Sequence, residues 1–167
     1  MPLDTAIQPD EIIIHDSLRL RKYDGRYELF LPGYQDPCVY QNSEGIFDDD
    51  KIPDLDYVKG MCGYLSKAGE LYYIEIMENG KFIPIGDVTV KSDNPPIAIW
   101  YSQYRGIGIG TLVMQAVINR LKALNVPKIT GSTVYVWNTS SQKLHEKLGF
   151  FKVGGNEKEF FYELELT

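Results

Sequence analysis

Glycine occupies every second position from 106 to 110 in the segment YRGIGIGT, residues 104–111, which lies between two regularly patterned stretches. The apolar run IAIWY at 97–101 predicts a short strand before it. Apolar residues after it fall at helical spacing and predict one face of an amphipathic helix: Val113, Val117, Leu121 and Leu124. A helix N-terminus presents unpaired N–H groups and a partial positive charge, and glycines before it let a phosphate approach. The segment therefore predicts a turn that holds a phosphate-bearing molecule.

Two common phosphate-binding loops do not fit this segment. A P-loop requires a lysine before its serine or threonine, but Gly110 directly precedes Thr111. A dinucleotide-binding loop that starts at Gly106 needs glycine at 111 and an acidic residue about 20 positions later. Position 111 is threonine, and the first acidic residue after the loop is Glu146.

The pattern that remains is Arg105-x-x-Gly108-x-Gly110, in which an arginine adds a permanent cation. A second register, Gln103-x-x-Gly106-x-Gly108, fits the same pattern. The first register is preferred because it places Gly110 at the start of the helix. A tight strand-to-helix turn without any ligand stays open as the alternative.

The charge distribution favours an anionic ligand near the loop. The net charge is −6, which argues against a nucleic-acid backbone as the main partner. Residues 1–93 hold 18 acidic and 9 basic side chains, whereas residues 94–145 hold no acidic side chain and five basic ones. An acid-free stretch around a glycine loop attracts anions, and the acidic remainder attracts cations more weakly.

The sequence also limits the cellular setting. It contains no apolar run of 18 residues, so we expect no membrane span and no membrane partner. The N-terminus has no basic start followed by a long apolar stretch, so no secretory signal is expected. Cys38 and Cys62 have no metal-site spacing, which favours two reduced thiols in a cytoplasmic protein without a metal.

The order of predicted elements indicates a mixed sheet with helices on its faces, an α+β architecture. Strands are expected at 18–23, 71–77, 81–90, 97–101, 128–137, 150–155 and 159–166. The Asn79-Gly80 pair predicts a hairpin turn, because both residues tolerate positive φ. Short helices are expected at 34–41 and 53–64, and a longer one after the glycines.

A second motif follows the glycine loop after one helix and one strand. Residues 137–150 read WNTSSQKLHEKLGF: a strand end, an asparagine, a helix with a polar start and then Leu-Gly-Phe. Together the two motifs resemble the GNAT superfamily of N-acetyltransferases, whose R/Q-x-x-G-x-G/A loop wraps the pyrophosphate of acetyl-CoA. The resemblance covers residues 70–166 well and residues 17–45 less specifically.

This resemblance implies the fold and the domain organisation. It implies the GNAT acyl-CoA N-acyltransferase fold, with a central mixed, mostly antiparallel sheet flanked by helices. The chain is then a single N-acetyltransferase domain over 1–167, with a variable lead-in at 1–16 and an acetyl-CoA-binding core at 94–150.

The same resemblance implies which residues hold the cofactor. The strand before the loop pairs with the pantetheine arm in this family, which implies backbone roles for Trp100 and Tyr101. Asn138 resembles the asparagine that hydrogen-bonds the pantetheine, and a helix cap is its other role. The phosphates would be held by backbone N–H groups of the loop: Arg105, Gly106, Ile107, Gly108, Ile109, Gly110 and Thr111.

The catalytic residues implied by the resemblance depart from the family pattern. Many members protonate the leaving thiolate with a tyrosine in a segment like L-Y-E-K-L-G-F, and this chain has His145 at that position. A cationic histidine can donate a proton, although a surface role is the alternative. Glu75, in the apolar strand LYYIEIM, is the candidate base, and a solvent-facing hairpin position is its alternative.

The acceptor is less well defined. Tyr72, Tyr73 and Tyr101 are candidates to line an acceptor pocket, with core packing as the alternative. The acidic run at 48–50 is a candidate to attract a cationic amine, with a solvated loop as the alternative. The expected partner is a small-molecule or peptide amine, and a homodimer is a further possibility.

Two function classes remain open. The first is an acetyl-CoA-dependent N-acetyltransferase that transfers an acetyl group to a primary amine by direct attack in a ternary complex. The second is a non-catalytic acyl-CoA-binding sensor or interaction domain, which the missing tyrosine makes plausible. A weaker third hypothesis places a different nucleotide in the glycine loop.

Overall fold

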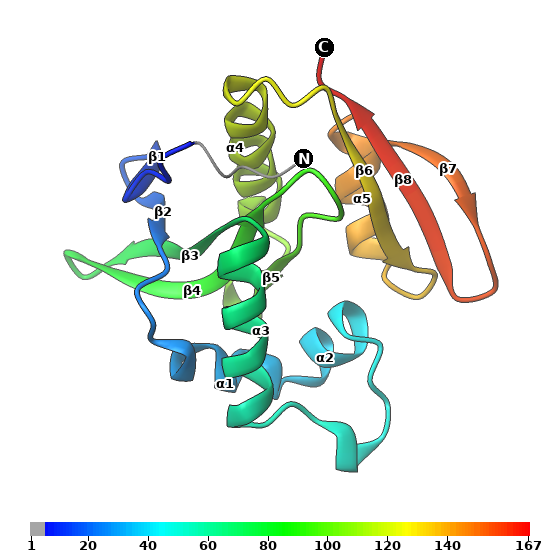
Figure 1. Cartoon of the computed structure of the whole chain (residues 1–167). Helices are drawn as coiled ribbons and strands as arrows, with labels where there is room; N and C mark the ends of the chain where they lie inside the picture. The colour runs from blue at the N-terminus through cyan, green and yellow to red at the C-terminus, as the bar shows by residue number, and fades with distance from the viewer. Residues whose placement is uncertain (1–5) are drawn as a thin grey trace.

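The computed structural model describes residues 6–167, and its strands form two separate sheets (Figure 1). The first sheet contains, in spatial order, β1 (Glu11–His15), β2 (Leu18–Lys22), β3 (Glu70–Glu78), β4 (Lys81–Val90) and β5 (Ile97–Ile99). The second contains β6 (Lys128–Tyr135), β8 (Glu159–Glu165) and β7 (Phe151–Gly155). All pairings within the sheets are antiparallel.

Helices fill the connections between these strands. They are the short 3-10 helices η1 (Tyr27–Phe30), η2 (Asp49–Lys51) and η3 (Ser102–Tyr104), and the α-helices α1 (Leu31–Tyr34), α2 (Pro37–Ser43), α3 (Leu55–Ala68), α4 (Ile109–Ala123) and α5 (Thr139–Lys147). The predicted α+β architecture is thereby confirmed. The segment expected to be a variable lead-in also contributes a strand, β1, which pairs with β2 and was not among the expected strands.

The β3–β4 hairpin turns where the sequence predicts. Asn79 and Gly80 both adopt positive φ, 50° and 79°, and the strands pair directly on either side, Glu78 with Lys81. Positive φ at both positions matches the right-handed twist of the strands, which is why Asn-Gly is favoured there. The pairing continues to the far end of both strands, so this hairpin forms the centre of the first sheet.

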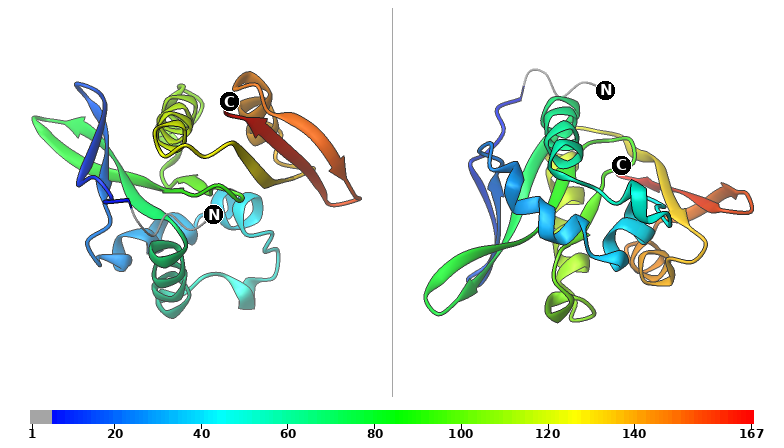
Figure 2. Two further views of the ribbon diagram at one scale, coloured as in Figure 1. Left: turned by 45° about the horizontal axis from the view of Figure 1, so that its top comes forward. Right: turned by 90° about the horizontal axis from the view of Figure 1, so that it is seen from below.

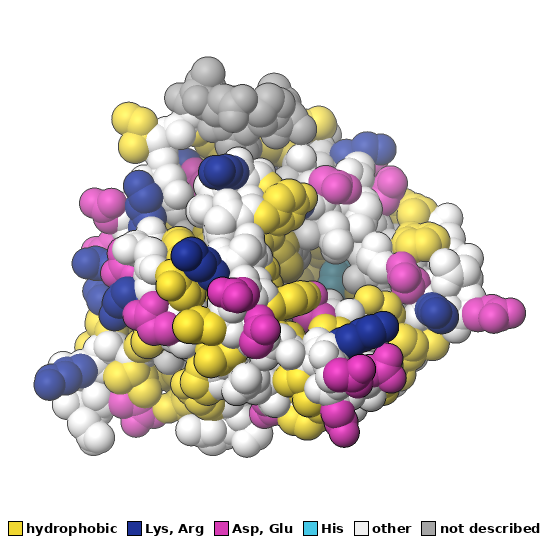
Figure 3. Space-filling model, turned by 60° about the horizontal axis from the view of Figure 1, so that its bottom comes forward, with side chains coloured by type: hydrophobic (Ala, Val, Ile, Leu, Met, Phe, Trp, Pro, Cys, Tyr) yellow, Lys and Arg dark blue, Asp and Glu magenta, His cyan; other side chains and the backbone are white. Residues whose placement is uncertain are grey.

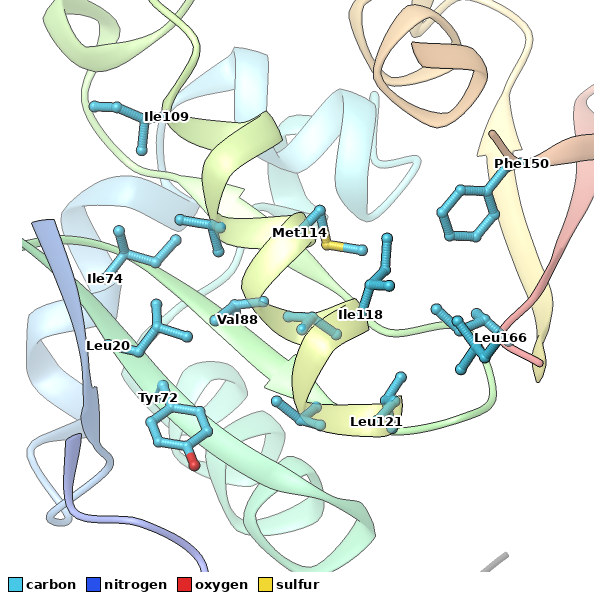
Figure 4. Packing of buried hydrophobic residues seen from close by; sticks show 14 of the residues in the cluster. Leu20, Tyr72, Ile74, Val88, Ile109, Met114, Ile118, Leu121, Phe150 and Leu166 are labelled. Atoms are coloured by element: carbon cyan, nitrogen blue, oxygen red, sulfur yellow. The ribbon is translucent and has the colours of Figure 1, made fainter. Parts of the chain in front are cut away.

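Helix α4 covers one face of the first sheet and also reaches the second sheet. Its apolar residues point from the helix toward Val88 and Ile74 on one side and toward Phe150 and Leu166 on the other (Figure 4). Three of the residues predicted to form its apolar face are fully buried: Val113, Val117 and Leu121. Burial of such side chains contributes about 1.5–3 kcal/mol each, so α4 holds the two sheets in one core.

The opposite face of the first sheet is covered by η1, α1 and α3. Figure 2 shows α3 and α4 on opposite sides of the strands. A second core lies there, with Phe30 at its centre against Trp100, ring centroids 5.0 Å apart. Tyr73 and Val58 complete it from β3 and α3. This core fixes the position of Trp100, which directly follows β5.

The two sheets touch at one end of β5 and β6 and separate along the rest. The contact is a single parallel bridge between Asp93 and Thr130, supported by Asn94 N donating to Thr130 O at 2.8 Å. Beyond this bridge β5 pairs only with β4, and β6 pairs only with β8. The second sheet therefore leans away from the first, as the views in Figures 1 and 2 show. The glycine loop starts at the open end of this gap.

Candidate active site

The backbone conformation of the loop explains two of its three alternating glycines. Gly106 and Gly108 adopt positive φ, 73° and 93°, and Gly108 is the N-cap of α4. The helix therefore begins at Ile109, one residue before the expected Gly110. Glycines face the cavity described below, whereas Ile109 is buried in the main core and Ile107 is exposed. One isoleucine thus anchors the loop while the bare backbone faces outward.

Six consecutive N–H groups of the loop, from Gly106 to Thr111, have no hydrogen-bond partner among residues 6–167. The first backbone bond of the helix is donated by Leu112 to Gly108 O, at 3.2 Å. Three of the six belong to the first turn of α4, where the helix dipole adds partial positive charge. We call these six N–H groups the amide cradle. Such a cluster of donors at a helix start is suited to phosphate oxygens.

The outer edge of β5 presents a second row of donors. Trp100 N donates to Ile85 O at 2.8 Å, and Pro96 O accepts from Thr89 N at 3.1 Å, so even-numbered residues face β4. Because backbone groups alternate along a strand, the N–H groups of Ile97, Ile99 and Tyr101 face the gap toward β6. None of these three has a partner within the described part of the chain.

This register refines the expected cofactor residues. Tyr101 lies on the open edge as expected, but the N–H of Trp100 is already used by β4. The edge also includes Ile97 and Ile99, which the sequence reasoning missed. No sequence signal identifies them, because the pairing of β5 with Gly86 and Val88 of β4 decides which N–H groups face the open edge.

The side chain of Arg105 has a different environment from the expected one. Its Nε donates to Ile99 O and its Nη2 to Trp100 O, both at 2.9 Å, and Nη2 also lies 3.3 Å from a carboxylate oxygen of Asp36. The guanidinium therefore satisfies the carbonyl groups at the end of β5 and ties them to the start of α2. Arg105 therefore lines the cavity with its guanidinium already bonded to protein groups.

A cavity of about 310 Å³ joins the amide cradle to the edge of β5. Its walls come from four elements: α2, β5, the glycine loop and the start of α5. The residues that line it include Cys38, Val39, Asn42, Ile97, Ile99, Gly106, Gly108, Gly110, Thr111, Asn138, Ser141 and Leu144. Figure 3 shows a hollow on the face that is turned forward, bordered by hydrophobic side chains.

Asn138 lies at the boundary of this cavity and caps α5. Its Oδ1 accepts from Ser141 N at 3.2 Å, and its Nδ2 donates to Asn42 O at 3.4 Å. The cap explains why the helix starts here. The second bond links α5 to the C-terminal end of α2, so Asn138 holds two walls of the cavity together.

His145 lies about two turns after Asn138 along α5, next to residues that line the cavity. Its Nδ1 contacts Ser141 O at 2.7 Å, and its ring packs against Phe150 and Tyr162. Since a carbonyl can only accept, Nδ1 carries the hydrogen and Nε2 is left with a lone pair in the neutral ring. Burial lowers the pKa of His145, which favours this neutral form at pH 7.

Glu75 is neither solvent-facing nor in the cavity. It is 6% exposed in β3, and its carboxylate accepts from Arg19 Nε at 2.8 Å across the strands. The guanidinium of Arg19 also lies over the ring of Phe82, 3.9 Å from its centroid. The carboxylate of Glu75 is thus occupied by a cation from the neighbouring strand.

The tyrosines expected at an acceptor pocket lie elsewhere. Tyr72 and Tyr73 are fully buried on opposite faces of β3, where their hydroxyls donate to Glu70 at 3.2 Å and Asp24 at 2.7 Å. Tyr101 packs against both cores. Tyr104, which the sequence reasoning did not single out, lines the cavity instead.

A buried carboxylate beneath the site was also missed. Asp87 of β4 is fully buried and accepts from Trp100 Nε1 at 2.7 Å and from Tyr34 Oη at 3.0 Å. It thereby connects the end of β5 to α1. Burial raises the pKa of Asp87 to about 7, and the two donors offset only part of that effect. An aspartate inside the run KFIPIGDVTV was the available signal.

Substitution of Asp87 by asparagine is expected to change how stability depends on pH. Between about pH 4 and pH 7 the folded protein keeps a proton that the unfolded chain has released, so stability falls as pH rises. Asparagine preserves the two hydrogen bonds without ionising. We expect the unfolding free energy of D87N, measured with urea, to gain on the order of 3 kcal/mol over wild type across this range. Parallel pH curves for both proteins would contradict this.

Two kinds of feature are absent from the described residues. Residues 6–167 contain no group of three or more histidine, cysteine or acidic side chains placed to hold a metal ion. None of the helices in the described part of the chain has the length and apolar character needed to cross a bilayer.

Two antiparallel sheets that separate beside an amide-rich glycine loop give an α+β domain whose free backbone donors suit an extended, phosphate-bearing molecule. The sequence model of the acetyltransferase (GNAT) family matches residues 38–150, about two thirds of the chain. The chain therefore belongs to the GNAT acetyltransferase family. A search among curated proteins finds no match.

Solved structures agree with this fold. A domain from Methanocaldococcus jannaschii superposes with a TM-score of 0.75 at 24% identity, covering 90% of this chain and 99% of that one. Spermidine N-acetyltransferase from Vibrio cholerae, in complex with CoA and spermine, has a TM-score of 0.69 at 16% identity, covering 91% and 97%. The microcin C7 self-immunity acetyltransferase MccE, in complex with acetyl-CoA and AMP, has a TM-score of 0.70 at 14% identity, covering 94% and 97%.

Proposed function

We propose that this protein is an acetyl-CoA-dependent N-acetyltransferase that acts on a primary amine of a small molecule or peptide in a ternary complex. The observation that carries the proposal is the meeting of two donor rows in one cavity. The amide cradle and the open edge of β5 both face it, and none of their N–H groups has a partner among the described residues.

The residues present fit coenzyme A in chemistry and in shape. A Cβ at Gly106 or Gly108 would stand in open space beside the cavity, so the bare backbone leaves room for phosphate oxygens. The N–H groups of Ile97, Ile99 and Tyr101 would pair with an extended amide chain as a neighbouring strand does. When bound, acetyl-CoA supplies an acetyl group activated as a thioester.

We propose His145 as the group that moves a proton at this site. Its neighbours Ser141 and Leu144 line the cavity, and its neutral ring keeps a lone pair at Nε2. This state favours acceptance of the proton of the amine over the donor role expected from the sequence. Glu75 is the weaker candidate base, since it is paired with Arg19 and lies outside the cavity lining.

Substitution of His145 by alanine is expected to lower kcat by about a hundredfold, the usual effect of losing a general acid or base. The Kd for acetyl-CoA should stay within about twofold of wild type, because His145 is not part of the amide cradle. Steady-state rates at saturating acetyl-CoA test this. The H15A variant, which removes the other histidine from β1, is the matched control. An unchanged kcat in H145A would assign the histidine a packing role.

The proposed function is tested by calorimetry followed by an activity assay. We expect acetyl-CoA to bind and free thiol to be released from it when an amine panel is added. Binding without thiol release on any amine would favour the non-catalytic sensor. Thermal-shift screening of CoA, NAD and ATP tests the third hypothesis, because a ligand at 100 times its Kd adds about 2.7 kcal/mol.

A further inference from the structure

Four aromatic side chains from distant parts of the sequence gather beside the cavity: Phe47, Tyr57, Tyr135 and Trp137. We call them the aromatic wall. The rings of Tyr135 and Trp137 stack with centroids 4.6 Å apart and planes 7° apart. Phe47 meets the ring of Trp137 edge-on at 5.2 Å. Phe47, Tyr57 and Trp137 are nevertheless 59%, 39% and 38% exposed. A cluster of aromatic side chains that stay open to solvent is a feature of binding sites.

The segment that brings Phe47 to the wall is shaped to fit it. Gly45 has a φ of 65°, and a Cβ there would lie 2.5 Å from the hydroxyl of Tyr135. The chain can therefore pass directly over Tyr135 only because residue 45 has no side chain. This places Glu44 on the same side, where its carboxylate accepts from Tyr57 Oη at 2.6 Å.

Hydrogen bonds of two consecutive residues connect the aromatic wall to the lining of the cavity. Trp137 Nε1 donates to Gln41 O at 3.1 Å, and the next residue, Asn138, donates to Asn42 O. Asn42 and Asn138 line the cavity. A molecule lying on the rings would extend toward the cavity, where the proposed transfer takes place.

Two carboxylates lie at the aromatic wall, those of Glu44 and Glu159. No lysine, arginine or histidine forms an ion pair with Glu44 among residues 6–167, and no cation in that range lies over any of the four rings. Glu159, which pairs with Tyr135 across the strands, stands on the other side. Burial, and after it the charges of Glu159 and Glu44, raises the pKa of Tyr135. The acidic run 48–50 follows Phe47 directly. Figure 3 shows acidic, basic and hydrophobic side chains side by side on the face that it presents.

We propose that the aromatic wall binds the acceptor, and that the acceptor is an amine with an apolar body and a second positive charge. The proposal rests on the proposed function for the transfer step. The aromatic faces take the apolar body, and their quadrupoles together with the carboxylate of Glu44 attract the second charge. The amine at the other end then reaches the cavity beside Asn42 and Asn138.

Two amines of equal chain length test the second charge. Diaminopentane carries a cation at each end, whereas pentylamine carries only one. We expect the wild-type protein to bind diaminopentane at least about tenfold more tightly in calorimetry, with and without CoA present. E44Q keeps a hydrogen-bond acceptor for Tyr57 and removes the charge, so it should lose that preference. W137L should weaken the binding of both amines.

E28Q is the matched control, because Glu28 is an exposed carboxylate of η1 with no polar contact to the wall. It should keep the wild-type preference. Equal binding of the two amines by wild type, no binding of diaminopentane at millimolar concentration, or an unchanged preference in E44Q would each overturn the proposal. The Kd for acetyl-CoA, measured separately, should not change in E44Q. A failure of acetyl-CoA to bind wild type would refute the proposed function. The amine titrations would still test whether the aromatic wall binds a doubly charged amine.

Discussion

Replacement of Gly108 by valine is expected to raise the Kd for acetyl-CoA about a hundredfold, a loss of about 2.7 kcal/mol. Gly108 is the N-cap of α4 with a φ of 93°, and its backbone faces the cavity. Valine disfavours this conformation and would place its branched side chain in front of the amide cradle. The phosphates would then lose both space and donors. Calorimetric titration of the purified variant with acetyl-CoA measures the change.

Gly80 offers a matched control for this experiment. It also has a positive φ, 79°, and a Cβ there would meet nothing within 4 Å, but it lies in the β3–β4 turn. G80V therefore carries similar backbone strain, which we expect to cost about 2 kcal/mol of stability. Its Kd for acetyl-CoA should remain that of wild type. If G108V bound the cofactor as tightly as G80V does, the amide cradle would not be the phosphate site.

Substitution of Gly33 by alanine should destabilise the protein by about 3 kcal/mol or more. Gly33 lies in α1 with its backbone against the side chain of Trp100, and an added Cβ would overlap Cβ and Cγ of that residue. Trp100 is 1% exposed and bonded to Asp87, so it has no room to move away. Urea unfolding monitored by tryptophan fluorescence gives the change in unfolding free energy.

The control for this substitution is a second glycine to alanine change, for which we expect the unfolding free energy to rise instead of fall. Gly60 lies inside α3, and nothing lies within 4 Å of a Cβ there. G60A should stabilise the protein by about 0.5–1 kcal/mol, because alanine is a better helix former. If G33A were as stable as wild type, the contact between α1 and Trp100 would be looser than the structure indicates.

The local features of the fold were predictable from sequence because each depends on a short stretch of chain. The Asn79-Gly80 turn follows from the φ preference of two residues, and α4 follows from its apolar spacing. The glycine loop follows from three residues that leave its backbone exposed. These signals place the start of α4 correctly to within one residue.

The features that the sequence reasoning missed depend on contacts between distant segments. The free edge of β5 is set by its register with β4, in which Gly86 lies opposite Ile99. The guanidinium of Arg105 turns toward carbonyl groups because β5 ends beside it. The aromatic wall requires Phe47 to meet Trp137, which lies far away in the chain. No local sequence pattern predicts such contacts between residues that are distant in the chain.

The bridge between Asp93 and Thr130 is the one strand pairing that joins the two sheets in residues 6–167. Apart from this bridge, they are held together by the side chains beneath α4 rather than by strand pairing. An extended ligand laid along β5 would act as a missing strand and join the two sheets along the gap between them. Hydrogen exchange in β6 and β8 would then slow on ligand binding, although neither strand belongs to the glycine loop. Binding of the ligand would then also make the second sheet more rigid.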